Sequence, residues 1–195
     1  MPRLFPRGAV LQRQDQMAEW LMYVKTGLLV VRQRDAAGRE TPVAVIGAGD
    51  LLGQSSALGQ PSLFSAEAIT PVGVCAVSAR GPRGTTAIAS VLLPGVALAH
   101  LRRALRSLSD WGLVARVPRL EQRIAMALCL LAALQPGRTL QLPSQGTLAE
   151  LLCATRESIN RTLRALERRG VLRRLPAARV EIDLPSLQRL AAAAS

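Results

Sequence analysis

The sequence predicts an α+β protein with an N-terminal β jelly roll, a long dimerisation helix and a C-terminal winged helix–turn–helix. Three observations support this fold class. Short apolar segments separated by glycine-containing turns fill residues 1–80, as in all-β sandwiches and barrels. An apolar seam at helical spacing follows from Pro94. Capping residues and a hairpin pattern then accompany two short helices between residues 144 and 182.

The composition indicates a globular protein with a polyanionic partner. Apolar residues make up 49% of the 195 residues, which excludes a disordered chain. The 25 Lys and Arg residues outnumber the 13 Asp and Glu residues, and the net charge of +12 favours nucleic acid or an anionic membrane surface. No apolar run reaches the roughly 18 residues of a spanning helix, and the N-terminus lacks the apolar core of a signal peptide. We therefore expect a cytoplasmic protein that does not enter a membrane.

Four strands can be recognised in the N-terminal region. They are LMYVKTG, LLVVRQR, PVAVIG and VGVCAVS, at residues 21–27, 28–34, 42–47 and 72–78. Turns are expected at DAAGRE and at GAGD, because Asp and Gly favour turn conformations. Cys75, in the last strand, and Cys129, further along the chain, are interpreted as small buried apolar residues.

A long helix is expected from Pro94 to about residue 116, because proline is favourable in a first helical turn. Small and apolar residues recur along it in alternating steps of three and four and form an a/d seam: Leu98, Leu101, Leu105, Leu108, Gly112 and Ala115. Such a seam can pack on the β-domain of its own chain, or it can pair with the same helix of a second chain. We favour the dimer, because the Gly and Ala end would let two helices approach closely.

A second helix is expected to begin near Pro118 and to continue through RLEQRIAMALCLLAAL. The sequence Gln135-Pro136-Gly137 should end it. The break after this helix places a domain boundary at about 136–142. The helix itself is nevertheless grouped with the C-terminal part of the chain, which then begins at residue 118.

The C-terminal region has the pattern of a winged helix–turn–helix. Ser144 is a good N-cap for a short helix whose Leu148, Leu151 and Leu152 would face inward. A tight turn follows, Thr155 can cap a second helix, and Gly170 is a typical helix end. The segments VLRRLP and ARVEID then predict a β-hairpin wing.

The second of these helices carries the chemistry expected of a DNA reader. Ile159, Leu163 and Leu166 form its buried stripe, and most residues opposite are charged. Arg can donate two hydrogen bonds to guanine and Glu can accept one from cytosine, while hydroxyls and the helix N-terminus suit phosphates. The candidate DNA-binding residues are Ser144, Thr155, Arg156, Glu157, Ser158, Asn160, Arg161 and Arg164. The alternative is an ordinary solvated basic face, but the flanking caps and hairpin favour DNA.

The stretch LAELLCATRESINRTLRALERRGVL resembles the helix–turn–helix of the cyclic-AMP receptor protein and fumarate–nitrate regulator family of bacterial transcription factors. FPRGAVLQRQD, LMYVKTGLLVV, GAGDLLGQSSAL and AEAITPV also resemble segments of the cyclic-nucleotide-binding-like jelly roll of that family. The resemblance implies a jelly roll at 1–93, a dimerisation helix at 94–117 and a DNA-binding domain at 118–195. It also implies that a homodimer binds an inverted repeat of TGTGA or GTGA half-sites, with RNA polymerase as a possible partner.

Within this resemblance, Arg156, Glu157 and Arg161 correspond to the base-reading residues. Cys153 stands where the family has a turn glycine, so a residue with a side chain would adopt positive φ there, at a strain of about 1 kcal/mol.

The cyclic-nucleotide site of the family is not matched. Gln54 replaces the Glu that would accept from the ribose, and Ser62-Leu63 replaces the Arg-Ser pair that would hold the phosphate. No Arg or Lys occurs from residue 40 to 79, and a buried phosphate without a cation is unfavourable. We therefore expect regulation without cyclic AMP.

Other cofactors and functions find little support in the sequence. Three cysteines are too few for an iron–sulfur cluster, and one histidine argues against a metal-dependent enzyme of the cupin type. No metal site and no catalytic residue is therefore expected, and RNA binding is disfavoured because aromatic residues make up only 3% of the chain. The remaining alternatives are an architectural DNA-binding protein that does not switch, and a regulator of the same family that responds to haem through His100 or to redox chemistry through Cys153.

Overall fold

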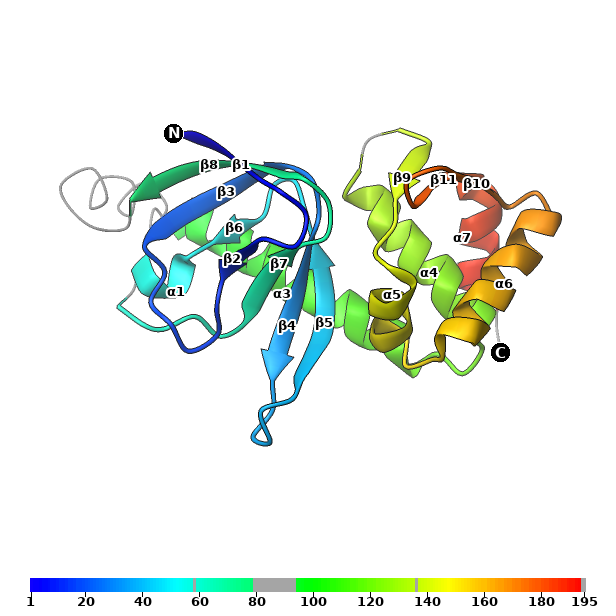
Figure 1. Ribbon diagram of the computed structural model, residues 1–195, viewed down its shortest axis with the longest axis horizontal. Helices are drawn as coiled ribbons and strands as arrows, with labels where there is room; N and C mark the ends of the chain where they lie inside the picture. Colours follow the sequence, from blue (N-terminus) through cyan, green and yellow to red (C-terminus); the bar gives the residue numbers. More distant parts are fainter. Residues whose placement is uncertain (58, 79–93, 136, 194–195) are drawn as a thin grey trace. The chain divides into compact units, whose positions relative to one another are not determined.

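The computed structural model describes all residues except 58, 79–93, 136 and 194–195. The chain divides into two compact units, Met1–Leu108 and Ser109–Ser195. The first unit is rich in strands and the second is mostly helical (Figure 1). The predicted α+β class is confirmed.

The first unit is built from two antiparallel four-stranded sheets. Their strand orders are β1-β8-β3-β6 and β2-β7-β4-β5. The strands are β1 (Pro2–Phe5), β2 (Val10–Gln12), β3 (Trp20–Thr26), β4 (Leu29–Arg34), β5 (Glu40–Ile46), β6 (Leu51–Leu52), β7 (Ser65–Ala68) and β8 (Val72–Ser78), with a short helix α1 (Gln54–Ala57) after β6. Fully buried side chains such as Val24, Leu29 and Val45 come from both sheets. This arrangement agrees with the predicted jelly roll.

The four strands expected from the sequence correspond to β3, β4, β5 and β8. The strands β1, β2, β6 and β7 contain only two to four residues each, which is too short for an alternating pattern to be recognised. The interpretation of Cys75 is wrong, because it is exposed on β8.

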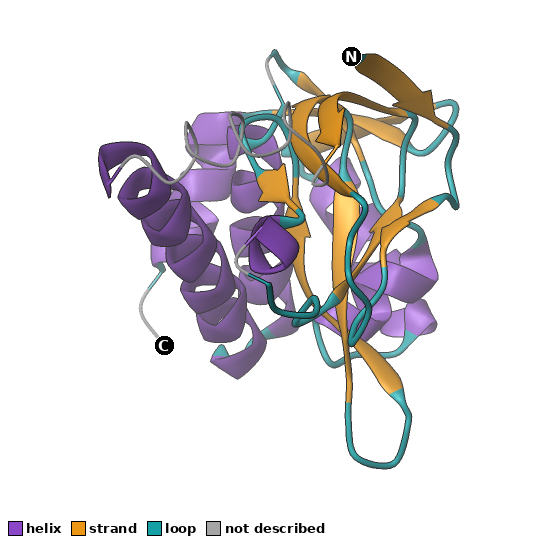
Figure 2. Cartoon of the chain, turned by 90° about the vertical axis from the view of Figure 1, so that its left-hand side faces the viewer, coloured by secondary structure: helices purple, strands orange, loops and turns teal. Residues whose placement is uncertain are grey.

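The hairpin formed by β4 and β5 extends beyond the rest of its sheet as a two-stranded arm (Figures 1 and 2). Asp35 closes its tip, accepting hydrogen bonds from the backbone N–H of Ala37 at 3.0 Å and of Arg39 at 2.9 Å. The N–H of Arg39 is the main reason that the pKa of Asp35 lies below its usual value. The sequence therefore predicts this turn correctly, and the tip is held by one carboxylate.

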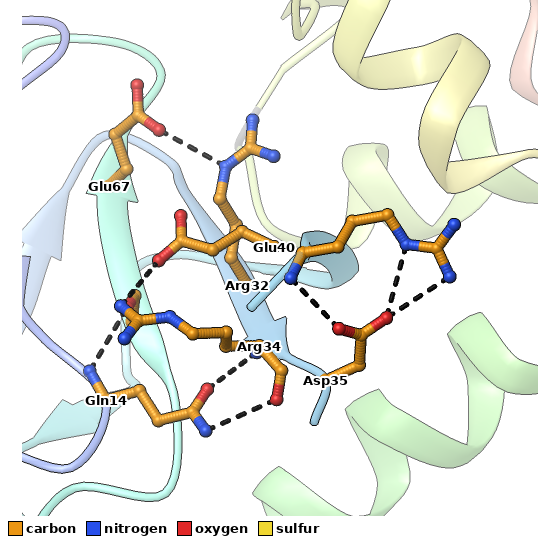
Figure 3. Close-up of polar contacts among 8 residues, drawn as sticks. Gln14, Arg32, Arg34, Asp35, Glu40 and Glu67 are labelled. Atoms are coloured by element: carbon orange, nitrogen blue, oxygen red, sulfur yellow. Dashed lines mark hydrogen bonds and ion pairs between the residues drawn. The ribbon is translucent and has the colours of Figure 1, made fainter. Parts of the chain in front are cut away.

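Charged pairs continue along the same arm (Figure 3). Arg32 lies 3.3 Å from Glu67 of β7, and Arg34 lies 3.3 Å from Glu40. Gln14 accepts from the backbone N–H of Arg34 at 2.7 Å. The contacts of Arg32 with Glu67 and of Arg34 with Gln14 hold the arm to neighbouring segments of the jelly roll, and the pair of Arg34 with Glu40 joins its two strands.

The long helix α3 (Pro94–Arg116) begins at the predicted proline. The sequence analysis treats this helix as a segment between two domains, whereas the division of the chain into two units falls within the helix, after Leu108.

The second unit contains α4 (Leu120–Ala133), β9 (Thr139–Gln141), α5 (Gln145–Leu151), α6 (Arg156–Arg168), β10 (Leu172–Leu175), β11 (Arg179–Ile182) and α7 (Leu184–Ala192). Its sheet has the order β10-β11-β9 and is antiparallel. Two elements were not predicted, β9 and α7. Because β9 pairs with β11 and α4 packs on α6 and α7, the boundary expected at 136–142 is wrong.

Candidate DNA-binding surface

Helix α6 is fixed in orientation by its buried stripe and its cap. Ile159, Leu163 and Leu166 are buried, as the sequence predicts. The Thr155 hydroxyl accepts from the backbone N–H of Ser158 at 3.1 Å and donates to the Ser158 hydroxyl. Thr155 therefore caps the helix, and both hydroxyls lie close to its positive N-terminal end.

The turn between α5 and α6 has the geometry that the sequence implies. Cys153 adopts a φ of 47°, in the left-handed region that favours glycine. Arg123 of α4 supports this turn by donating to the carbonyl of Leu152 at 2.5 Å and to that of Cys153 at 3.4 Å. The sequence analysis missed this role of Arg123, although an arginine among the apolar residues of α4 is a recognisable signal.

The face of α6 opposite its buried stripe is open to solvent. Arg156, Glu157, Arg161 and Arg164 are exposed, whereas Ser158 and Asn160 are half-buried. Among the described residues, Arg156, Arg161 and Arg168 take part in no ion pair within 4.0 Å. Their charges are therefore available to an external anion.

The first turn of α5 lies beside the N-terminal end of α6. Ser144 is exposed, and its hydroxyl caps α5 by accepting from the N–H of Thr147 at 3.1 Å. The Arg156 guanidinium rests against Gly146, since a Cβ there would lie 2.7 Å from Nη2. The structure thus brings Ser144, Thr155 and Arg156 to one end of the helix–turn–helix, and it adds Gly146 as a residue that shapes the site.

The arginines of the wing are engaged within the domain. Arg173 lies 2.6 Å from Glu181 on the paired strand. Arg174 lies 3.0 Å from Glu167 of α6 and donates to Asn160 at 3.1 Å. The backbone N–H of Arg174 also holds the pKa of Glu167 below its usual value. These pairings were not predicted, because they form only when β10 pairs with β11 and packs on α6.

A small, partly open cavity of the jelly-roll unit lies against α3 and is lined in part by Gln54. The cavity has a volume of about 70 Å³ and is lined by residues that include Gln54, Asp50, Phe64 and His100. Ligand pockets usually measure about 300–1,000 Å³. Of the pair that replaces Arg-Ser, Ser62 is buried and Leu63 is 72% exposed.

An internal ion pair lies beside this cavity. Arg103 of α3 lies 2.6 Å from the buried Asp50, and it also donates to the carbonyl of Ala48 at 2.8 Å. The second carboxylate oxygen of Asp50 accepts from the N–H of Gly47 at 2.8 Å. The guanidinium of Arg103 is therefore already neutralised by a carboxylate of the same chain.

His100 and Cys153, the candidate residues for a haem or a redox response, belong to different compact units. His100 is half-buried and meets Tyr23 edge-on, with ring centroids 6.3 Å apart. Within the described ranges, no three His, Cys, Asp or Glu side chains gather in a way that could hold a metal ion. Cys153 is exposed. Cys129 is half-buried, and this burial raises the pKa of its thiol.

The predicted a/d seam of α3 is largely uncovered in the single chain. Leu98, Leu101, Leu105 and Leu108 are between 44% and 58% exposed. Gly112 is exposed and Ala115 is half-buried.

Across the described residues, no helix combines the length and apolar character that crossing a bilayer requires.

Comparison with known proteins gave matches to both parts of the chain. Residues 2–95 match the family model of the cyclic nucleotide-binding domain, and residues 122–193 match that of the Crp-like helix-turn-helix domain. A search among curated protein sequences gave no match.

Solved structures similar to this chain include FixK2 from Bradyrhizobium japonicum, with 25% identity, a TM-score of 0.80 and coverage of 100% of this chain and 98% of that chain. TTHB099, a CRP-family transcriptional regulator from Thermus thermophilus, has 24% identity and a TM-score of 0.74, with 98% and 97% covered. TTHA1359, a CRP/FNR-family regulator from the same organism, has 23% identity and a TM-score of 0.72, with 99% of each chain covered.

Proposed function

The chain belongs to the CRP/FNR family of transcription regulators, and we propose that it binds an inverted-repeat DNA operator as a homodimer without requiring cyclic AMP. The observation that carries this proposal is the exposed face of α6, where Arg156, Glu157 and Arg161 face solvent at the end of a capped helix. Helices of this kind enter the major groove with their N-terminal residues at the base edges.

Each residue type on this surface has a distinct task in the proposed complex. Arg156 and Arg161 would donate to guanine, and Glu157 would accept from the amino group of cytosine. Ser144, Thr155 and Ser158 would contact phosphates, and Arg164 would add attraction to the backbone. Together these contacts suit a half-site of the TGTGA or GTGA type.

A homodimer follows from the uncovered seam of α3. Four leucines that are roughly half exposed along one helix are a large apolar surface for a single chain. Pairing two such helices would bury them, and it would present two recognition helices to half-sites about 34 Å apart, one turn of DNA.

Independence from cyclic AMP is supported by the jelly roll. A cavity of about 70 Å³ and the use of Arg103 by Asp50 leave neither space nor a free cation for a ring phosphate among the residues around it. A buried phosphate would then lack compensation for its lost hydration.

The test is fluorescence anisotropy at physiological salt, in which the purified protein is titrated against a TGTGA inverted repeat and a scrambled duplex, with and without cyclic AMP. We expect tight and selective binding that cyclic AMP does not change. Equal binding to both duplexes would instead assign the protein to architectural DNA-binding proteins. Weak binding rescued by cyclic AMP would show that the jelly roll still takes the nucleotide.

A further inference from the structure

Within the first unit, α3 places small and polar residues beside a largely apolar wall of the jelly roll. The apolar residues on the wall of the cavity of about 70 Å³ are Val31, Ala44, Ile46, Leu51 and Phe64. From the helix, the residues that line this cavity are His100, Ala104, Ser107 and Leu108. Ala104 stays exposed although it lines the cavity, so the helix covers the apolar wall incompletely.

The leucines of the same helix remain largely open to solvent. Leu101 is 54% exposed and Leu105 is 58% exposed. Three leucines directly follow cavity-lining residues in the sequence: Leu101 after His100, Leu105 after Ala104 and Leu108 after Ser107. Because consecutive helix residues are about 100° apart around the axis, a rotation by one residue would exchange the three smaller or more polar side chains for leucines. In a single chain, the burial of apolar surface favours this rotated helix.

The ion pair of Arg103 with Asp50 opposes such a rotation. The Nε group of Arg103 donates to Oδ1 of Asp50 at 2.6 Å, and Nη2 donates to the carbonyl of Ala48 at 2.8 Å. The guanidinium also lies against Gly49, since a Cβ there would be 3.3 Å from Cζ. Asp50 accepts a second bond from the N–H of Gly47, so the carboxylate is itself fixed on the jelly roll.

The place of Arg103 along α3 determines where the leucines lie. Arg103 is two residues from both Leu101 and Leu105, which is about 160° around the helix axis. Holding Arg103 on the jelly roll therefore turns both leucines away from it. In the rotated helix, Ala104 would take the place of Arg103, and Asp50 would lose its cation. A buried carboxylate without its partner is strongly unfavourable.

We propose that the ion pair of Arg103 with Asp50 is a latch that keeps the leucines of α3 available to a second chain. When the latch is removed, α3 rotates by one residue and packs its leucines on its own jelly roll, in a form that does not dimerise. Arg103 and Asp50 are then positioning residues for the dimer, although neither belongs to the leucine seam. This inference rests on the proposed function, because it concerns the dimer that binds the operator.

The test compares dimer formation in full-length variants by sedimentation equilibrium. The main variant combines Arg103→Met with Asp50→Asn, which leaves no buried charge unpaired and keeps a carbonyl oxygen for the N–H of Gly47. It should remain folded in thermal unfolding, but its dimer dissociation constant should rise by about tenfold or more, because only the unrotated form can pair. Arg103→Lys keeps the charge and a donor, and it should dimerise within about threefold of the wild type.

Two substitutions of alanine by leucine test the rotation itself. Ala104→Leu extends into the cavity only in the present rotation, so it should restore the dimer when it is added to the main variant. The control is Ala99→Leu, which adds the same side chain at an exposed position that does not line the cavity, and it should restore nothing. The same comparison in Arg103→Met alone serves if the main variant does not fold.

Leu105→Ala shows whether the leucines become buried when the latch is removed. At concentrations where the chains are single, this change should lower the unfolding temperature of the main variant. It should leave that of the wild type nearly unchanged, because Leu105 is exposed there. Equal shifts in the two proteins would contradict the rotation.

Three further results would overturn the inference. They are a main variant that dimerises as the wild type does, a dimer that is lost in Arg103→Met and recovered when Asp50→Asn is added, and equal effects of Ala104→Leu and Ala99→Leu. If the wild-type protein still forms a dimer that selects the operator, each of these results leaves the proposed function standing. A wild-type protein that stays monomeric, both free and on the operator, would remove the proposed homodimer and this inference together.

Discussion

The helix–turn–helix and the jelly roll use their arginines in opposite ways. On α6, Arg156 and Arg161 are exposed and lie in no ion pair within the described residues, so they can meet an external anion. Beside the jelly-roll cavity, Arg103 is paired with the buried Asp50 of its own chain. The difference shows that the arginine beside the jelly-roll cavity is neutralised within the chain, whereas the arginines on the exposed face of α6 keep their charges open to a ligand.

The largest effect is expected from the helix that both units share. Replacing Leu101 and Leu105 together by Glu would place charges along the exposed seam and prevent two helices from pairing. Because two linked half-site contacts strengthen each other by about 10²–10⁴-fold, operator affinity should fall at least a hundredfold. Sedimentation equilibrium would show the loss of the dimer. The control is Leu63→Glu, which changes a still more exposed leucine of the jelly roll and should leave the dimer intact.

Arg161 gives the most direct test of the difference between arginines that are exposed without an ion pair and arginines that are paired within the chain. Its change to Ala should cost about 1–3 kcal/mol on the preferred operator and relax the preference at one base pair. The matched control is Arg39→Ala, which removes the same charge from the exposed arm of the jelly roll. Binding titrations against operator and random duplexes give both values, and an equal loss on random DNA would exclude direct readout by Arg161.

A smaller effect is expected where α5 makes room for the base-reading end of α6. Gly146→Ala adds a Cβ at 2.7 Å from the present position of Arg156 Nη2, so that this flexible side chain has to shift. Alanine is the better helix former by about 0.5–1 kcal/mol, so the free energy of unfolding should stay equal or rise. Operator affinity should fall by about threefold to tenfold, in line with one displaced polar contact. Thermal unfolding and anisotropy measure the two effects, and an affinity that follows stability would contradict this interpretation.

The smallest effect concerns the link between wing and helix in acid. The pKa of Glu167 is lowered in the folded state, chiefly by the N–H of Arg174. A lowered folded-state pKa contributes stability above the unfolded pKa, and this stability is lost as the pH falls through the folded value. Glu167→Gln should therefore unfold at a lower temperature than the wild type at neutral pH, and the difference should shrink in acid. A difference in unfolding temperature that stays the same from neutral to acid pH would contradict this interpretation.

Much of the DNA-binding half could be predicted because its signals are local. Ser144 and Thr155 cap helices within three residues of themselves, and the buried stripe of α6 repeats at helical spacing. The positive φ of Cys153 also followed from the family pattern. Such features depend on neighbours along the chain.

The parts that could not be predicted depend on partners far apart in sequence. Arg103 and Asp50 are separated by 53 residues, and Arg123 and Leu152 by 29. Even the pair of Arg174 with Asn160 spans 14 residues and requires the wing to be placed first. The strands β6 and β9 form because partner strands supply their hydrogen bonds, and their own two or three residues carry no recognisable pattern.

The open leucine seam of α3 has a consequence for how such a regulator could respond to the cell. In the proposed dimer, which does not require cyclic AMP, the abundance of the chain itself can serve as the input. At low abundance, where most chains are single, the concentration of pairs rises with the square of the concentration of chains. A modest change in the synthesis or degradation of the chain would then produce a larger change in operator occupancy. The amount of protein would regulate the operator in place of a small-molecule ligand.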